Sequence, residues 1–287
     1  MAAADTFFRE YTSSDAISKY SRATAGFGIS YLLDHDYKAI YLKALDLLPS
    51  DVRQRGIRVL EFGCGAGMNL LHLVAVLNRE GVKVLQAVGT DFSPVLIDAA
   101  KREAKDYLPE INGQRIEFYV ARNETLMEDL SSVLGKRRAE LEESFDFILG
   151  INTIRYCHRE RKEMDCAQAI FDLLAPQGVC VVIDMNDRFP LFRSALKDRL
   201  SGEERSKQEY YLPSLQEYAR PFAETGFEVL RKEHFCWIPH SSGPFMCQIL
   251  RLLTPVLDTL AGSRAMRSLV LARKPASQGA SVARASR

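Results

Sequence analysis

Three alternate glycines, Gly63, Gly65 and Gly67, follow a short run of β-forming residues and precede an apolar stretch with helical spacing. Glycine allows the backbone to turn sharply and to approach a ligand closely, because no Cβ is in the way. At the carboxyl end of a strand, the free N–H groups that begin a helix face such a ligand. The segment from Glu61 to Gly67 is therefore a candidate binding turn, although such glycines also occur for packing alone.

Two acidic residues end successive predicted strands beside this turn. Glu61 ends the first strand, and Asp91 ends the second, 24 residues after Gly67. A carboxylate in the second position accepts hydrogen bonds from both hydroxyls of a ribose in dinucleotide sites. The pattern indicates a ribose-bearing ligand. The alternative is that Asp91 caps the next helix, a task that Ser93 before Pro94 would perform at least as well.

Three motifs in combination resemble the class I S-adenosylmethionine-dependent methyltransferases. They are the glycine turn, residues 89–94 around Asp91, and residues 173–179, and the similarity extends over residues 58–183. The resemblance implies that S-adenosylmethionine is the cofactor, with its methionine part over Gly63 to Gly67 and its ribose on Asp91. The resemblance also places further residues at the cofactor site, namely Glu61, Cys64, Phe92 and Asn152.

The contact with adenine is left open by the resemblance. The family usually has an acidic residue just beyond the third strand, where this sequence has Asn123 followed by Glu124. The amide oxygen of Asn123 can accept a hydrogen bond from an exocyclic amine, and Glu124 is the alternative acceptor. Both residues are therefore candidates for the adenine site.

Two other functions are compatible with a glycine turn of this kind. The fingerprint of nicotinamide-dependent oxidoreductases requires its third glycine at the position that Met68 occupies, so this function is the weaker candidate. The second alternative is a non-catalytic, nucleoside-binding partner protein of the same fold. Turnover of S-adenosylmethionine with any acceptor would exclude that alternative.

The segment after the fourth predicted strand, residues 150–159, lies where strand ends would face the transferring methyl group. In this segment we expect His158 to act as a general base and Arg155 to hold an acidic acceptor, although both are alternatively ordinary loop residues. A histidine with an ordinary pKa is mostly neutral at pH 7 and accepts a proton. We expect the remaining histidines farther from the reaction: His35 in an N-terminal cap, His72 in the first helix, and His234 and His240 near the terminal strands.

The acceptor is expected to be a small molecule, methylated on oxygen or nitrogen. The segment after the fourth strand lacks the Asn-Pro-Pro-Tyr motif of methyltransferases that act on nucleic-acid amines or glutamine amides. The net charge of +1 also provides no basic excess for binding nucleic acid. The apolar segment at about residues 238–267 would suit a hydrophobic acceptor; the alternative is a helix that covers the sheet edge.

β-rich and helical segments alternate from residue 57 onward, which is typical of a parallel sheet covered by helices on both faces. With the resemblance, this predicts an α/β fold with a doubly wound, seven-stranded, mostly parallel sheet. We expect an N-terminal helical cap over residues 1–50, a methyltransferase domain over 51–274 and a disordered tail over 275–287. In the cap, Tyr11 and Tyr20 resemble aromatic lid residues that contact the cofactor, although core packing is the alternative.

Composition favours a folded cytoplasmic protein. Hydrophobic residues make up 47% of the 287 residues and charged residues 26%. No secretory signal and no stretch long enough to span a bilayer is expected. The six cysteines form no CxxC pair, and Asp184 with Asn186 is too thin a ligand set, so no metal is expected.

Overall fold

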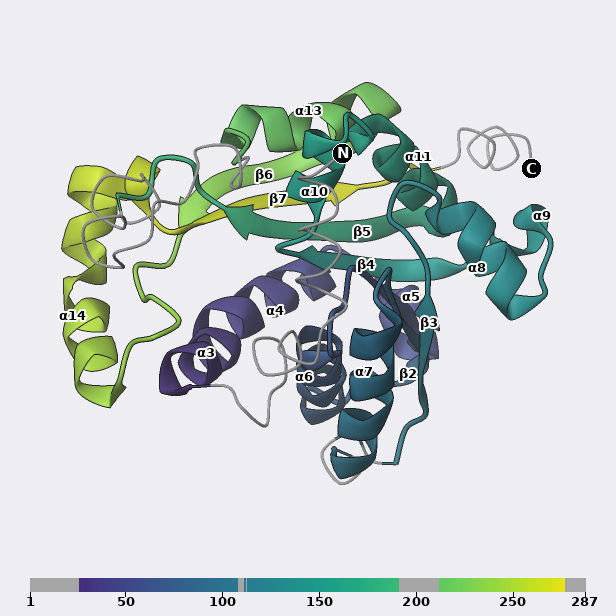
Figure 1. Ribbon diagram of the computed structural model, residues 1–287, viewed down its shortest axis with the longest axis horizontal. Helices are drawn as coiled ribbons and strands as arrows, with labels where there is room; N and C mark the ends of the chain where they lie inside the picture. Colours follow the sequence, from purple (N-terminus) through teal and green to yellow (C-terminus); the bar gives the residue numbers. More distant parts are fainter. Residues whose placement is uncertain (1–25, 108–110, 112, 191–211, 277–287) are drawn as a thin grey trace, which may run out of the picture.

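Seven strands form one sheet in the order β3-β2-β1-β4-β5-β7-β6 in a computed structural model that describes residues 26–107, 111, 113–190 and 212–276 (Figure 1). All neighbouring strands are parallel except β7, which is antiparallel to both β5 and β6. This confirms the expected mostly parallel sheet. The strands are β1 (Ile57–Phe62), β2 (Val84–Asp91), β3 (Ile116–Val120), β4 (Phe145–Ile151), β5 (Leu174–Met185), β6 (Glu228–Phe235) and β7 (Arg267–Arg273).

Helices cover both faces of the sheet, as the near-continuous apolar strands require (Figure 1). Successive residues of a strand point to opposite faces, so Val59 enters one core and Leu60 enters the other. The first core lies beneath α4 (Lys38–Asp46), α6 (Met68–Arg79) and α7 (Pro94–Asp106). The second lies beneath α8 (Leu126–Leu134), α11 (Glu163–Leu173) and α13 (Leu215–Thr225). Shorter helices are α5 (Ser50–Arg55), α9 (Arg138–Leu141), α10 (Ile154–Arg159) and η3 (Gly262–Arg264).

The described part of the N-terminal segment is helical, as expected. Helix α3 (Phe27–Leu32) continues through a single π-helical turn, η2 (Leu33–Tyr37), into α4. Such turns insert an extra residue into an α-helix and often occur at functional sites. Tyr41 is fully buried between this segment and the sheet core. Tyr11 and Tyr20 lie outside the described residues, as does most of the expected tail.

The apolar insertion forms a single helix, α14 (Pro244–Ala261), in which Cys247 is the buried residue. Its outward side chains are strongly exposed, by 75% for Phe245 and 80% for Leu252. Within the described residues, Pro244–Arg264 is the one helical segment long and apolar enough to cross a membrane. The expectation from sequence was that no uninterrupted apolar stretch is long enough, and α14 is indeed interrupted by Gln248, Arg251 and Asp258. Length and composition alone do not place α14 in a bilayer.

Candidate functional site

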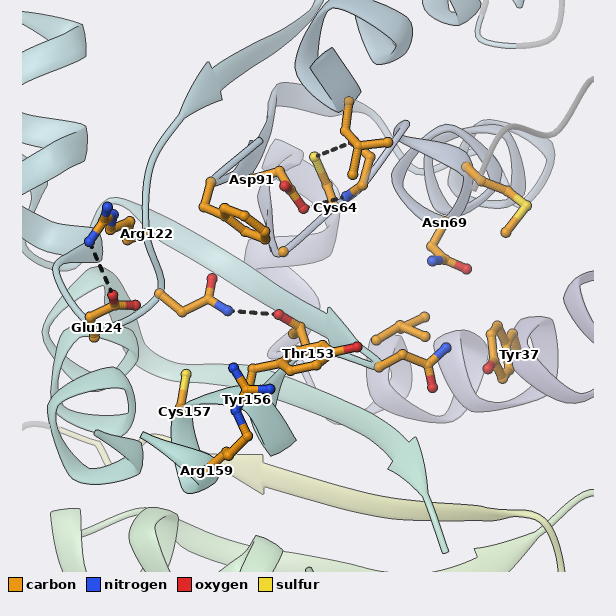
Figure 2. Close-up of a pocket in the computed structure, with 18 of the residues that line it drawn as sticks. Tyr37, Cys64, Asn69, Asp91, Arg122, Glu124, Thr153, Tyr156, Cys157 and Arg159 are labelled. Carbon is orange, nitrogen blue, oxygen red and sulfur yellow. Dashed lines mark hydrogen bonds and ion pairs between the residues drawn. The ribbon is translucent and has the colours of Figure 1, made fainter. Parts of the chain in front are cut away.

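A cavity of about 420 Å³ lies at the carboxyl ends of β1, β2 and β4, with α3 and η2 forming part of its wall (Figure 2). The strand order reverses between β1 and β4, because the chain runs outward from β1 to β3 and then returns to β4. Open α/β sheets bind their ligands at this switch point. The volume is within the range of small-molecule sites.

The glycine turn forms the floor of this cavity. Gly63, Gly65 and Gly67 all have positive φ angles, of 62°, 55° and 84°. A Cβ on Gly63 would lie 2.0 Å from Thr153 Oγ1, so the turn packs directly against the segment that follows β4. Gly63, Cys64 and Gly65 line the cavity. Gly67 is the residue before α6, and its backbone packs on the Phe118 ring rather than facing the cavity.

Asp91 lies at the end of β2 and lines the same cavity next to Cys64 (Figure 2). The Gly65 N–H donates to its Oδ2 and the Ser93 N–H to its Oδ1, each at 2.9 Å. Burial raises the pKa of this carboxyl to about 6, and the two N–H groups oppose that shift. The cap of α7 is Ser93, whose Oγ accepts from the Leu96 N–H at 3.3 Å. Asp91 is therefore available to a ligand.

Asn123 and Glu124 line the cavity beyond the end of β3. The Asn123 side-chain NH2 donates to Thr153 Oγ1 at 2.7 Å (Figure 2). This bond fixes the amide so that its oxygen remains as the acceptor. Asn152 and Phe92, also expected at the cofactor site, line the cavity as well.

Glu61 lies behind the cavity rather than in it. Its side chain is fully buried, and neither carboxylate oxygen has a hydrogen bond of ordinary geometry in the described residues. Burial raises its pKa well above the usual value, although the nearby Leu70 N–H and Asn69 side chain lower it. Asn69 does line the cavity. A direct contact between Glu61 and the ligand, as expected from sequence, is therefore not what the structure shows.

The expected catalytic pair, His158 and Arg155, does not line the cavity. His158 projects from the side of α10 opposite to Tyr156, since a helix turns by about 100° per residue. The Arg155 guanidinium instead lies over the Tyr156 ring, 4.6 Å from its centroid, and donates to the Tyr156 hydroxyl at 2.7 Å. The His158 ring packs edge-on against Tyr218 at 5.6 Å, and its burial lowers its pKa. Arg155 forms a 2.8 Å ion pair with the buried Asp184. The assignments of His158 as base and Arg155 as anion holder are therefore not retained.

Several residues that line the cavity were not singled out from sequence. His240, expected near the terminal strands and far from the reaction, lines the cavity. A Cβ on Gly28 would lie 2.7 Å from the His240 carbonyl oxygen, so Gly28 allows α3 to pack closely against this loop. In the sequence, Gly28 is therefore the residue that could have indicated this contact between α3 and the His240 loop. Other unanticipated lining residues are Ile29, Leu32, Leu33, Tyr37, Met68, Asn69, Thr153, Tyr156 and Arg159.

Metal-ligating side chains do not gather in the part of the chain that the structure describes. No group of three or more His, Cys, Asp or Glu residues there is arranged to hold an ion. Asp184 is engaged by Arg155, and the Asn186 amide donates to the carbonyl oxygens of Ser263 and Ala265. All six cysteines are unpaired and buried.

The sheet order and the glycine turn beside Asp91 together define a class I S-adenosylmethionine-dependent methyltransferase. The chain belongs to the methyltransferase domain family, which matches residues 33–232. S-adenosylmethionine is the cofactor of this family, and the protein is an S-adenosylmethionine-dependent enzyme. No curated protein matches the sequence significantly.

Solved structures share the fold at low sequence identity. Magnesium protoporphyrin IX methyltransferase from Synechocystis PCC 6803, with bound SAH, aligns at a TM-score of 0.57 and 14% identity, covering 94% of this chain and 99% of that one. A putative methyltransferase in complex with the Haloferax volcanii Trm112 activator aligns at 0.54 and 14%, covering 94% and 98%. The CurJ carbon methyltransferase aligns at 0.52 and 16%, covering 95% and 58%. At these identities the likeness shows the fold alone.

Proposed function

We propose that this enzyme transfers the methyl group of S-adenosylmethionine to an oxygen or nitrogen atom of a small molecule. The observation that carries the proposal is that one cavity is lined both by Asp91 and by apolar residues of the N-terminal helix. The same space therefore serves a ribose-bearing donor and an apolar acceptor. The carbon methyltransferase among the structural neighbours shows that the fold does not itself select the acceptor atom.

The lining residues fit the parts of S-adenosylmethionine. Asp91 has the carboxylate for the ribose hydroxyls, and the Asn123 amide oxygen is an acceptor for the adenine amine. Phe92 and Leu96 supply apolar surface to the adenine, while Gly63 and Gly65 allow close approach of the methionine part. When bound, S-adenosylmethionine supplies a methyl group made electrophilic by its positive sulfonium. The chain's own residues then act by aligning the acceptor and excluding water.

A small acceptor is favoured by the enclosure of the cavity beneath the N-terminal helix. Ile29, Leu32 and Leu33 of this helix contribute apolar side chains to the wall, and Met68 contributes another from α6. Leu32 and Leu33 are themselves almost fully buried. A wall of this kind excludes water and suits an acceptor with apolar surface.

The test uses S-adenosylmethionine carrying a trideuterated methyl group, incubated with the purified protein and a cell extract. We expect the label in the low-molecular-mass fraction, with an equal amount of S-adenosylhomocysteine, and much less of both with the Asp91→Ala variant when S-adenosylmethionine is subsaturating. Mass spectrometry of the separated fractions measures both products. Label recovered in protein or nucleic acid would contradict the proposed acceptor class, and absence of S-adenosylhomocysteine would favour a non-catalytic protein.

The adenine contact can be tested by the Asn123→Ala variant. Wild-type protein should bind S-adenosylhomocysteine about tenfold more tightly than S-inosylhomocysteine. The reason is that the inosine analogue lacks the exocyclic amine that would donate a hydrogen bond to the Asn123 side-chain oxygen. In the variant this preference should be lost. Calorimetric titration with both ligands measures the ratio. A preference that persists in Asn123→Ala but disappears in Glu124→Ala would assign the contact to Glu124 instead.

The affinity for S-adenosylhomocysteine should depend on pH through Asp91. The pKa of this carboxyl is about 6 in the free protein, and ribose hydroxyls that donate to the ionised form lower it on binding. Affinity should therefore be constant above about pH 6 and fall as the pH decreases below it, by up to tenfold per unit. Titration from pH 8 to pH 5 measures this acid limb. Asp91→Asn should lack it; an unchanged limb in that variant would assign the titration to another group.

A further inference from the structure

A buried arginine lies behind two of the cavity residues. Arg267, the first residue of β7, is 0% exposed and forms no ion pair with any described residue. Its guanidinium donates instead to Asn152 Oδ1 at 2.5 Å and to His240 Nε2. Asn152 and His240 both line the cavity. A buried charge is costly unless it is paired, and among the described residues no carboxylate forms an ion pair with Arg267.

These two hydrogen bonds determine what Asn152 and His240 present to the cavity. Since His240 accepts from Arg267 at Nε2, its hydrogen is carried by Nδ1. Burial and the adjacent Arg267 lower the pKa of His240 to about 3, so the ring stays neutral at physiological pH. The oxygen of Asn152 is likewise used, which leaves its NH2 group. Each residue therefore has a hydrogen-bond donor left over.

The neighbouring charged and titratable groups leave these two hydrogen-bond donors unchanged. Tyr37 lines the cavity, and burial raises its pKa to about 12, although Arg267 lowers it, so its hydroxyl keeps its hydrogen. The carboxylate of Asp184 is held by Arg155, and that of Asp36 is adjacent to the Cys236 thiol. Neither carboxylate bonds to Arg267. Within the described residues, the groups around Arg267 thus combine donors with a positive charge that no carboxylate contacts directly.

We propose that Asn152, His240 and Arg267 form an oxyanion site for the methyl acceptor, which carries an acidic hydroxyl, as in a phenol or a carboxylic acid, and reacts as its anion. This inference rests on the proposed methyltransferase function and names its acceptor class. Arg267 acts as a positioning residue, because it orients Asn152 and His240 and stabilises the negative charge from behind them.

The transfer step balances without a general base. The acceptor loses its proton to solvent as it binds, because the site favours its anion. The acceptor oxygen then forms a bond to the methyl carbon while the carbon–sulfur bond breaks, and sulfur retains the electron pair. The negative charge of the acceptor and the positive charge of the sulfonium cancel. No role for His158 as a base is then required.

The test measures the ionisation of 4-nitrophenol, whose phenolate has its own absorbance, in complex with the protein and S-adenosylhomocysteine. We expect the pKa of the bound phenol to be at least one unit lower than in solution, which corresponds to about tenfold tighter binding of the phenolate. Calorimetry should likewise show benzoate binding about tenfold more tightly than neutral benzamide. A phenol pKa that is unchanged or raised, or equal binding of benzoate and benzamide, would overturn the proposal.

Three variants separate this site from the cofactor site. Arg267→Met and His240→Phe should each return the phenol pKa to its solution value while S-adenosylhomocysteine still binds, which shows that the fold is kept. The matched control is Arg264→Met, which removes an exposed cation close in sequence and should leave the phenol pKa lowered. A phenol pKa that stays lowered in His240→Phe would overturn the proposal even if Arg267→Met failed to fold. If the wild-type protein does not bind S-adenosylhomocysteine, the proposed function itself is refuted.

Discussion

Gly63→Ala should lower the free energy of unfolding by about 3 kcal/mol or more and abolish measurable binding of S-adenosylhomocysteine. A left-handed backbone costs an L-residue about 1 to 2 kcal/mol, and Gly63 has a φ of 62°. The new Cβ would also lie 2.0 Å from Thr153 Oγ1 and 2.6 Å from Thr153 Cβ, which forces the glycine turn and the segment after β4 apart. Denaturant unfolding and calorimetry measure the two effects.

The matched control for this substitution is Gly135→Ala. Gly135 has nearly the same φ, 61°, but an added Cβ would meet nothing within 4 Å. This variant should lose only the backbone contribution of about 1 to 2 kcal/mol and keep its affinity for S-adenosylhomocysteine. Removing the clash in the double variant Gly63→Ala with Thr153→Gly should restore part of the stability lost by Gly63→Ala. Equal losses for Gly63→Ala and Gly135→Ala would show that close packing against Thr153 has no energetic role.

Asp91→Ala should weaken the binding of both S-adenosylmethionine and S-adenosylhomocysteine by about 30-fold, or about 2 kcal/mol, while the fold remains intact. The reason is the loss of a charged acceptor for two ribose hydroxyls. Its control is Asp98→Ala, which removes an exposed carboxylate from α7 and should leave affinity unchanged. Calorimetry on both variants and circular dichroism of the folded state are the measurements. Unchanged affinity in Asp91→Ala would refute the ribose assignment.

Much of the sheet was predictable because each central strand is a local, apolar run between turn signals. Strand β2 ends at Asp91, as expected from sequence, and β1 ends at Phe62, one residue beyond Glu61. Helix ends were less certain because capping depends on single side chains. The segment after β4 contains a separate short helix, α10, and α11 begins only at Glu163.

The cofactor end of the cavity was also predictable, because its residues follow strands whose carboxyl ends must meet at one edge of the sheet. Gly63, Asp91, Asn123 and Asn152 all line the cavity. The failures arise where the rotation of a helix matters. Because His158 follows β4 in the sequence, we expected it near the reaction. Helix α10 instead directs Tyr156 and Arg159 to the cavity and His158 away from it.

The proposed acceptor end was not predictable, because contacts between distant segments create it. His240 reaches the cavity from the loop after β6, and Arg267 of β7 lies behind it, 115 residues away from its partner Asn152. No local pattern in the sequence reports such pairings. An arginine can hold an acidic acceptor, but Arg155 does not suit this role because its charge is neutralised by Asp184.

The most direct test of the proposed cofactor site is a crystal structure of the protein with S-adenosylhomocysteine. We expect ribose hydroxyls within hydrogen-bonding distance of the Asp91 carboxylate, the adenine amine at the Asn123 oxygen, and the sulfur atom facing the part of the cavity lined by Asn152 and His240. Density for the nucleoside elsewhere, or a ribose that contacts neither oxygen of Asp91, would contradict it.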